Sequence, residues 1–308
     1  MKSKGLEALR HFRRGVKYQQ QGHLDKAKDA YQQALRADKS LAAAYNNLGF
    51  ISLNRGDYAT AIKYFQEVIR REPDNVEALH NLGYAYEKQD MTGTAKTFYL
   101  KALQLDASNE EAYINLGMIA EREANFFEAR DHYLKAMQVN NDSAHARFCL
   151  ALLYERMDLF DEAIAAYKDA IRYDPTYVKA LFNVARLYHT QGQHSEAITH
   201  FAKVLSLDPQ NAQAYNSLGV IYEEIGDHPQ AIAYLQTAVE LDMFRPEAHL
   251  NLARALYHHH YTQLNASALQ SIIERIQMTL SLDPDNYEAK TLLEEVETLL
   301  NIFSARPS

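Results

Sequence analysis

Two consecutive stretches decide the fold: residues 76–109 read VEALHNLGYAYEKQDMTGTAKTFYLKALQLDASN, and residues 110–143 read EEAYINLGMIAEREANFFEARDHYLKAMQVNNDS. They match column by column, and the match continues along the chain. Seven alanines recur at a fixed interval of 34 residues, at Ala27, Ala61, Ala95, Ala129, Ala163, Ala197 and Ala231. A spacing held this strictly over most of a 308-residue chain indicates stacked copies of one supersecondary unit.

Each copy has the pattern of two amphipathic helices. A small residue such as Gly117 stands twelve positions before the alanine, and a large ring such as Tyr133 stands four positions after it. Offsets of three and four place residues on one helix face, so the two helices can pack small side chains against large ones. A turn signal such as Gly56-Asp57 separates the helices, and a cluster such as Pro73-Asp74-Asn75 closes the copy.

These columns resemble tetratricopeptide repeats from residue 8 onward. The resemblance implies an all-α fold, a right-handed superhelical α-solenoid of about eight helix-turn-helix repeats with one continuous core. We expect an N-terminal lead-in at 1–7 and a C-terminal capping helix at 287–304. The eight repeats are expected at 8–41, 42–75, 76–109, 110–143, 144–177, 178–211, 212–245 and 246–286, the last with a seven-residue insertion.

Composition limits the class of protein. The net charge of -8 argues against a nucleic-acid binder or a protein held on an anionic membrane, because both usually need a basic face. Cys149 is the single cysteine, so no intrachain disulfide can form. We expect no signal peptide at Met1–Gly5, because no apolar run follows it, and no run in the sequence approaches the roughly 20 apolar residues that span a bilayer. We expect a cytoplasmic protein without direct membrane insertion.

Functional residues are expected in columns that core packing leaves free, which in the family line a concave groove. The sixth column of the repeats holds Asn47, Asn81, Asn115, Asn183 and Asn251. An amide side chain both donates and accepts, so such a ladder can bind successive backbone amides of an extended peptide. The ladder resembles that in the superhelical repeats of O-linked N-acetylglucosamine transferases. The alternative is that these asparagines bond locally between helices.

The fifth and ninth columns form a predicted apolar stripe, and repeat 6 adds basic side chains. The stripe consists of Phe12, Phe50, Tyr84, Ile114, Met118, Phe148, Leu152 and Phe182. An exposed stripe of this size usually marks a partner surface, unless neighbouring helices and long polar side chains cover it. Lys179, Arg186 and His189 could meet an acidic partner segment, or they are ordinary solvated charges.

The sequence carries no signature of catalysis. A P-loop, G-x-S-x-G, H-E-x-x-H and paired cysteines at ligand spacing are all missing from it. The three consecutive imidazoles from His258 to His260 lie in an insertion at 257–265 and point about 100° apart on a helix, so they do not easily converge on one metal. We therefore expect no enzyme, no metal site and no cofactor, and expect the insertion to lengthen one or both helices.

The sequence thus predicts a non-enzymatic adaptor that binds a peptide or helical segment of a partner protein in its concave groove. The alternative is a self-assembling structural scaffold that oligomerises through its terminal helices. The final helix motivates this alternative, because its apolar set is wide for a cap alone: Leu292, Leu293, Val296, Leu299, Leu300, Ile302 and Phe303.

Overall fold

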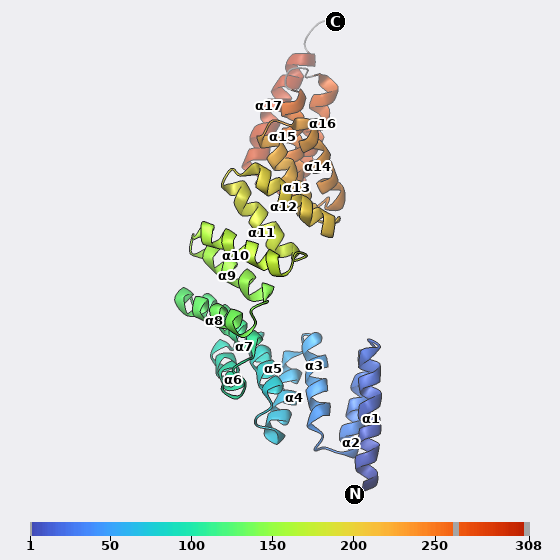
Figure 1. Ribbon diagram of the computed structural model, residues 1–308. Helices are drawn as coiled ribbons and strands as arrows, with labels where there is room; N and C mark the ends of the chain where they lie inside the picture. Colours follow the sequence, from blue (N-terminus) through green and yellow to red (C-terminus); the bar gives the residue numbers. More distant parts are fainter. Residues whose placement is uncertain (1, 261–264, 305–308) are drawn as a thin grey trace. The chain divides into compact units, whose positions relative to one another are not determined.

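The computed structural model describes residues 2–260 and 265–304, and in that part of the chain all regular structure is α-helical (Figure 1). Contacts between the helices group them into two compact units, Met1–Asp158 and Leu159–Ser308. The division falls inside the predicted fifth repeat, between its two helices, where the sequence predicts one continuous stack.

Unit 1 consists of helical hairpins in which each helix packs against the next along the chain. Its helices are α1 (Lys2–Gln20), α2 (Leu24–Ala37), α3 (Ala42–Asn54), α4 (Tyr58–Arg71), α5 (Val76–Glu87), α6 (Thr92–Leu105), α7 (Glu110–Arg122), α8 (Phe126–Val139) and α9 (Ala144–Arg156). The hairpins are α1–α2, α3–α4, α5–α6 and α7–α8. The all-α solenoid of helical hairpins is confirmed within the unit.

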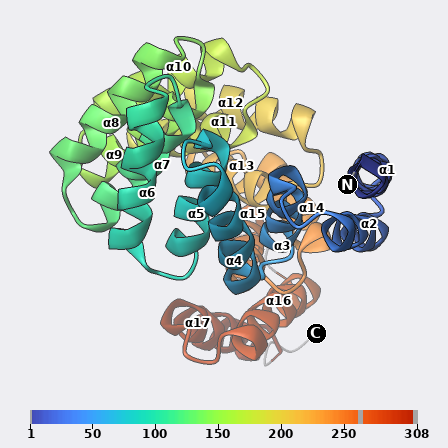
Figure 2. The ribbon, with the colours of Figure 1, turned by 90° about the horizontal axis from the view of Figure 1, so that it is seen from below.

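Unit 2 continues the same pattern. Its helices are α10 (Phe160–Tyr173), α11 (Val178–Thr190), α12 (His194–Leu207), α13 (Ala212–Glu224), α14 (His228–Leu241), α15 (Pro246–His260), α16 (Ala266–Leu282) and α17 (Tyr287–Ser304). Hairpins form from α11–α12, α13–α14 and α15–α16, and α17 packs against α16, as both ribbon views show (Figures 1 and 2).

The hairpin core is built by the small and ring columns of the sequence. The rings of Tyr99 and Tyr133 are fully buried, and each lies directly on the glycine of its own repeat. A Cβ atom added to Gly117 would stand 2.4 Å from Cε1 of Tyr133, so only the missing side chain permits this approach. Burial of a ring of this size contributes roughly 1.5–3 kcal/mol, which makes these columns the main source of hairpin stability.

The hairpin turns that the structure describes each contain a residue in the left-handed conformation. Gly56 has φ +73°, and the next residue, Asp57, donates its N–H to the carbonyl of Ser52 over 2.9 Å. The side chain of Asp57 then accepts from the N–H of Thr60, which caps α4. At the equivalent position Ala124 has φ 59°, a conformation that L-residues adopt only with strain.

The predicted insertion lengthens the last hairpin of unit 2. Helices α15 and α16 have 15 and 17 residues, against 13 and 14 for α13 and α14. Asn265 caps α16 by accepting from the N–H of Ala268 over 2.9 Å. The rest of the inserted segment, 261–264, lies outside the described residues.

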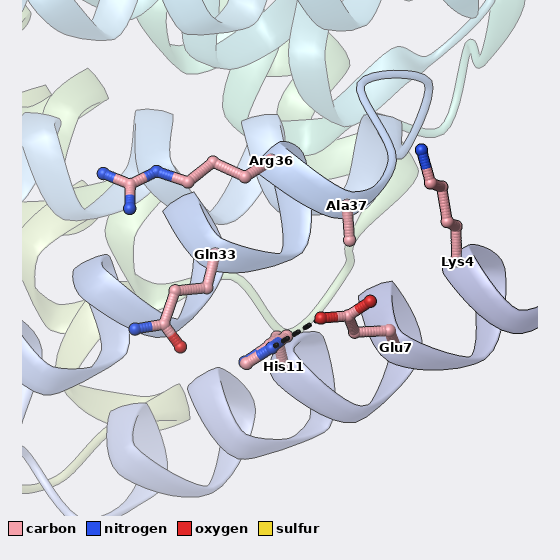
Figure 3. Close-up of a pocket in the computed structure, with 6 residues that line it drawn as sticks. All are labelled: Lys4, Glu7, His11, Gln33, Arg36 and Ala37. Carbon is pink, nitrogen blue, oxygen red and sulfur yellow. Dashed lines mark ion pairs between the residues drawn. The ribbon is translucent and has the colours of Figure 1, made fainter.

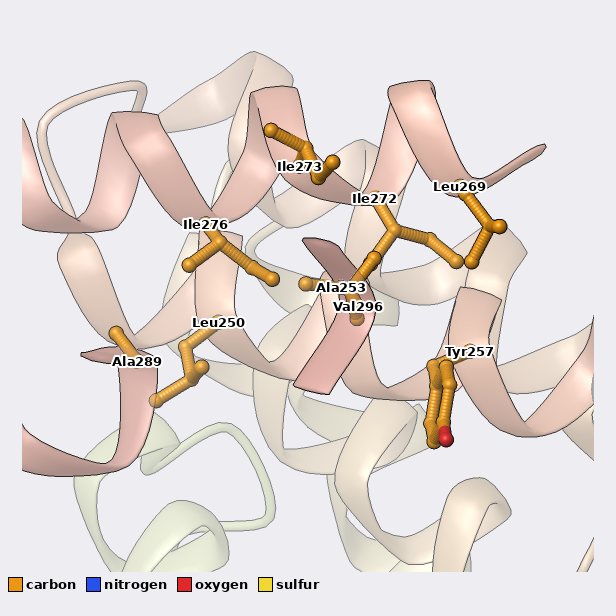
Figure 4. Packing of buried hydrophobic residues seen from close by; sticks show 9 residues of the cluster. All are labelled: Leu250, Ala253, Tyr257, Leu269, Ile272, Ile273, Ile276, Ala289 and Val296. Atoms are coloured by element: carbon orange, nitrogen blue, oxygen red, sulfur yellow. The ribbon is translucent and has the colours of Figure 1, made fainter. Parts of the chain in front are cut away.

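The apolar residues of α17 pack within unit 2. Ala289 and Val296 are fully buried beside Ile272 and Ile276 of α16 and Leu250 of α15 (Figure 4). Further apolar side chains of α17 pack against the same cluster: Leu292, Leu293, Leu299, Leu300 and Phe303. The width of the apolar set is therefore accounted for by packing against the last hairpin.

Candidate functional site

One face of unit 1 is formed by the first helices of its repeats. Helix α3 contacts α5, and α7 contacts α9, more extensively than the second helices of neighbouring repeats contact one another. The stack is therefore tighter on the side of the first helices. We call the surface of α3, α5, α7 and α9 that carries Phe50, Asn81, Tyr84, Asn115, Met118 and Leu152 the A face of unit 1.

The ninth repeat column keeps its apolar side chains at the surface. Phe50 is 41 % exposed and Met118 40 %, whereas Tyr84 and Leu152 are half-buried. The ammonium of Lys88 lies 4.9 Å from the centroid of the Tyr84 ring, so this ring is partly covered by a cation of its own helix. The ninth column thus presents an apolar stripe with exposed ends on α3 and α7.

The fifth column belongs largely to the core. Ile114 is 3 % exposed and Phe148 9 %, so both offer little surface to a ligand. Phe182, in unit 2, is half-buried, and its ring packs edge-on against Phe201 at 5.2 Å between centroids. The fifth column is therefore largely covered within the chain. This agrees with the alternative that part of the apolar stripe is not exposed to a partner.

Three of the five asparagines have partners inside the chain. Asn183 donates to the hydroxyl of Tyr167 over 3.2 Å, and Asn251 donates to the side-chain oxygen of Asn216 over 3.1 Å. The hydroxyl of Tyr31 donates to Gln19 over 2.7 Å, and burial raises its pKa while the nearby side chain of Asn47 acts to lower it, so Asn47 interacts with this ring inside the chain. For these positions the local-bonding alternative holds.

Asn81 and Asn115 differ from the other three. Both are half-buried, and neither forms a side-chain hydrogen bond with any other residue that the structure describes. The ring that precedes Asn81 in the stack is Phe65, which has no hydroxyl. The corresponding ring for Asn115 is Tyr99, whose hydroxyl donates to Glu87 over 2.9 Å. The amides of Asn81 and Asn115 are therefore available to an external ligand.

The acidic twelfth column joins successive repeats of unit 1. Glu87, 8 % exposed, accepts from the hydroxyl of Tyr99, and its other oxygen lies 3.7 Å from Nη2 of Arg122 in the next repeat. Burial, with the Glu87 carboxylate adding to it, raises the pKa of Tyr99, so its hydroxyl stays a donor. Glu87 therefore links two successive repeats of unit 1.

The same arrangement recurs one repeat later. Glu121 accepts from the hydroxyl of Tyr133 over 2.9 Å and from Nη1 of Arg156 over 2.8 Å. In both cases the acid and the arginine are 35 residues apart in sequence. Charges paired in this way hold neighbouring repeats together instead of marking a binding site.

The basic candidates of repeat 6 lie in unit 2 and do not act as one group. Lys179 and Arg186 are exposed. His189 is half-buried, and its Nε2 lies 2.8 Å from Oε2 of Glu224 on α13. His189 therefore already contacts an acid of this chain, which lessens its use for an acidic partner segment.

Two further features bear on chemistry. Cys149 is 6 % exposed, and burial together with the carboxylate of Glu121 raises its pKa to about 12, so the thiol is a poor nucleophile. A depression between α1 and α2 is lined by Lys4, Glu7, His11, Gln33, Arg36 and Ala37 (Figure 3). Its charges are mixed, and His11 and Glu7 face each other at 4.0 Å.

Among the described residues, no helix is long and apolar enough to cross a bilayer.

Comparisons with known proteins agree with the repeat architecture. A tetratricopeptide-repeat family model matches residues 40–108, 142–210 and 179–243, which together exceed half of the chain. Two further models of the same repeat match residues 8–41 and 216–277. No curated protein matches the chain.

Several solved structures share the fold. The C-terminal part of a TPR repeat-containing protein from Cytophaga hutchinsonii is 15 % identical, with 79 % of this chain and 97 % of that chain covered and a TM-score of 0.65. A tetratricopeptide repeat protein from Parabacteroides merdae is 20 % identical, with 82 % and 100 % covered and a TM-score of 0.59. The MamA protein is 29 % identical, with 56 % and 94 % covered, but its TM-score of 0.46 is too low to carry an argument. At these identities the first two likenesses show the fold alone.

Proposed function

The chain belongs to the tetratricopeptide-repeat family, and on that premise we propose that it is a non-enzymatic cytoplasmic scaffold that binds an extended segment of a partner protein on the A face of unit 1. One observation carries the proposal. On successive first helices, Asn81 and Asn115 have amides without a partner among the described residues, and they are flanked by the exposed apolar side chains of Phe50 and Met118.

The combination of side chains favours an extended segment over a helix. A helix satisfies its own backbone amides except at its ends, so side-chain amides along its length would find few backbone partners. An extended segment exposes both N–H and C=O groups at every residue, and an asparagine amide can donate to one and accept from the other. The exposed side chains of Phe50 and Met118 would then receive apolar side chains of the segment.

The assembly alternative has less support. It rests on the width of the apolar set of α17, and that set packs against α15 and α16. Ile302 keeps 49 % of its surface exposed, which is too little for an apolar interface by itself.

The proposal is tested by selecting peptides from a displayed random library with the full chain, and then measuring their affinity by fluorescence anisotropy. The double variant Asn81→Ala/Asn115→Ala removes two hydrogen-bonding groups. At about 0.5–1.5 kcal/mol for each bond, the affinity should fall by roughly 5- to 150-fold. Phe50→Ser should weaken the same peptides.

A matched control is Phe127→Ser, because Phe127 is 70 % exposed on α8, outside the A face. Its affinity for the selected peptides should stay at the wild-type value. Circular dichroism should show that all variants keep their helices. If the folded double variant binds the peptides with wild-type affinity, the proposal that the A face binds them is wrong.

A further inference from the structure

Three potential metal ligands lie close together in unit 2, where helices α11 and α13 end and helix α12 begins. His189 lies in the last turn of α11, His194 is the first residue of α12, and Glu224 is the last residue of α13. One ligand atom of each lies within 4.8 Å of those of the other two. Nε2 of His189 is 2.8 Å and Nδ1 of His194 is 3.8 Å from the same carboxylate oxygen of Glu224.

The fold fixes these three side chains. The turn between α11 and α12 contains Gly192 with φ +72°, whose N–H donates to the carbonyl of His189 over 2.9 Å. The following N–H, of Gln193, donates to the carbonyl of Tyr188 over 2.8 Å. This closed turn holds the two imidazoles on one side, with ring centroids 6.0 Å apart. Helix α11 contacts α13, and that contact delivers the carboxylate from the next repeat.

One ring nitrogen of the group lacks a partner. Nδ1 of His194 is buried and forms no hydrogen bond, although His194 itself is only partly buried. A buried polar atom without a partner costs free energy, and an ion in reach of the atom would remove that cost. Nδ1 of His228, at the equivalent position of the next repeat, is in the same state, so the free nitrogen supports a site only together with the convergence of all three ligand atoms. The Glu224 oxygen nearest to Nδ1 of His194 already interacts with His189, so the carboxylate leaves the His194 nitrogen unsatisfied.

We propose that His189, His194 and Glu224 bind a divalent transition-metal ion of the zinc type. Two imidazole nitrogens and one carboxylate oxygen are ligands that zinc prefers in proteins. Zinc bonds of about 2.0–2.2 Å in tetrahedral geometry separate the ligand atoms by roughly 3.4 Å. The observed distances of 2.8 and 3.8 Å lie on either side of this value, so small side-chain rotations complete the site.

Three protein ligands leave one tetrahedral position open. A water molecule or a side chain of a bound protein can take it, because His189, His194 and Glu224 all keep part of their surface exposed. The ion would replace the contact between His189 and Glu224 and would give the buried nitrogen of His194 its partner.

The next repeat offers an internal comparison. Glu223, His228 and His258 occupy the same columns, with acid and histidine exchanged. His258 hydrogen-bonds Glu223, and the rings of His228 and His258 lie 5.9 Å apart. The three ligand atoms of this second group do not come together as closely as those of His189, His194 and Glu224. It therefore serves as a control set of the same residue types.

The experiment is a titration of the full chain, freed of metal with a chelator, with cobalt(II) followed by visible absorption and with zinc followed by calorimetry. The wild type should bind one equivalent. His194→Ala should weaken binding by at least about 100-fold, since losing a ligand costs no less than losing a residue that only orients one. His189→Ala/His194→Ala should abolish binding at this site, and Glu224→Gln should weaken it while keeping a polar side chain.

The control His228→Ala/His258→Ala should bind one equivalent with unchanged affinity. Circular dichroism of each metal-free variant should match that of the wild type, which separates loss of a ligand from loss of fold. Three outcomes would overturn the proposal: a wild type that binds neither ion, a folded His189→Ala/His194→Ala variant with unchanged affinity, or binding that is lost only in the control.

Discussion

The glycine beneath each buried ring gives the sharpest test of the packing. In Gly117→Ala the new Cβ would stand 2.4 Å from Cε1 of Tyr133, against 3.4–4 Å for an ordinary contact. The ring must therefore move by roughly 1 Å, and its hydrogen bond to Glu121 must stretch. Overpacking of this kind costs about 1–3 kcal/mol, and a lost hydrogen bond adds about 0.5–1.5 kcal/mol. The higher helix propensity of alanine offsets about 0.5–1 kcal/mol of this loss in stability. We expect a net loss of about 1–3 kcal/mol in the free energy of unfolding.

Gly93→Ala is the matched substitution. Gly93 lies in α6 of the preceding repeat, is exposed, and would have nothing within 4 Å of an added Cβ. This variant should gain up to about 1 kcal/mol. Urea denaturation followed by far-UV circular dichroism measures both. The two variants should differ from the wild type in opposite directions. If Gly117→Ala is as stable as the wild type, the ring does not rest on the backbone of α7.

Two other substitutions test the turn and a buried histidine. Ala124→Gly should stabilise the chain by about 0.5–1 kcal/mol in the same urea assay, because relief of the left-handed strain outweighs the extra freedom of glycine in the unfolded chain; a destabilised variant would contradict this. Burial lowers the pKa of His80, and the Glu111 carboxylate 3.4 Å away offsets this only in part. The unfolded chain, with a histidine pKa of about 6.5, then binds the proton more readily than the folded chain, so stability is full above this pH and declines as the pH falls below it. His80→Phe should reduce the loss of thermal stability between about pH 7 and pH 5, and an unchanged slope would show that His80 does not contribute.

The periodic part of the structure could be predicted from the sequence. A 34-residue interval and offsets of three and four fix which residues share a helix face, and the glycine and ring columns do pack as predicted, as Gly117 and Tyr133 illustrate. Phe50 and Met118 of the ninth column lie exposed at the surface, whereas their role in binding stays a prediction. These features depend on one repeat at a time, which is why a repeat pattern contains them.

Features that depend on contacts between repeats were harder to predict. Ile114 precedes Met118 by one helical turn on the same face, yet it is buried whereas Met118 is exposed. The grouping of the helices into two units also follows from such contacts. The pattern within one repeat carries no information on which of its residues the next repeat buries.

The candidate metal site escaped sequence reasoning for the same reason. His189 and Glu224 are 35 residues apart on different helices, and local ligand motifs such as H-E-x-x-H describe two ligands on one helix. A signal was nonetheless present. The 35-residue offset that joins Glu87 to Arg122 also joins His189 to Glu224, so this offset predicts contacts between the twelfth and thirteenth columns of adjacent repeats.

The link from Tyr99 through Glu87 to Arg122 has a consequence for how such a chain can change length. Each arginine serves the acid of the copy before it, and Arg156 stands in the next copy where Arg122 stands in this one. Excision of residues 110–143 as a block would bring Arg156 to Glu87 in the place of Arg122. Duplication or deletion of whole 34-residue copies therefore conserves these Glu–Arg pairs. A deletion of any other length would leave a buried carboxylate such as that of Glu87 without its arginine.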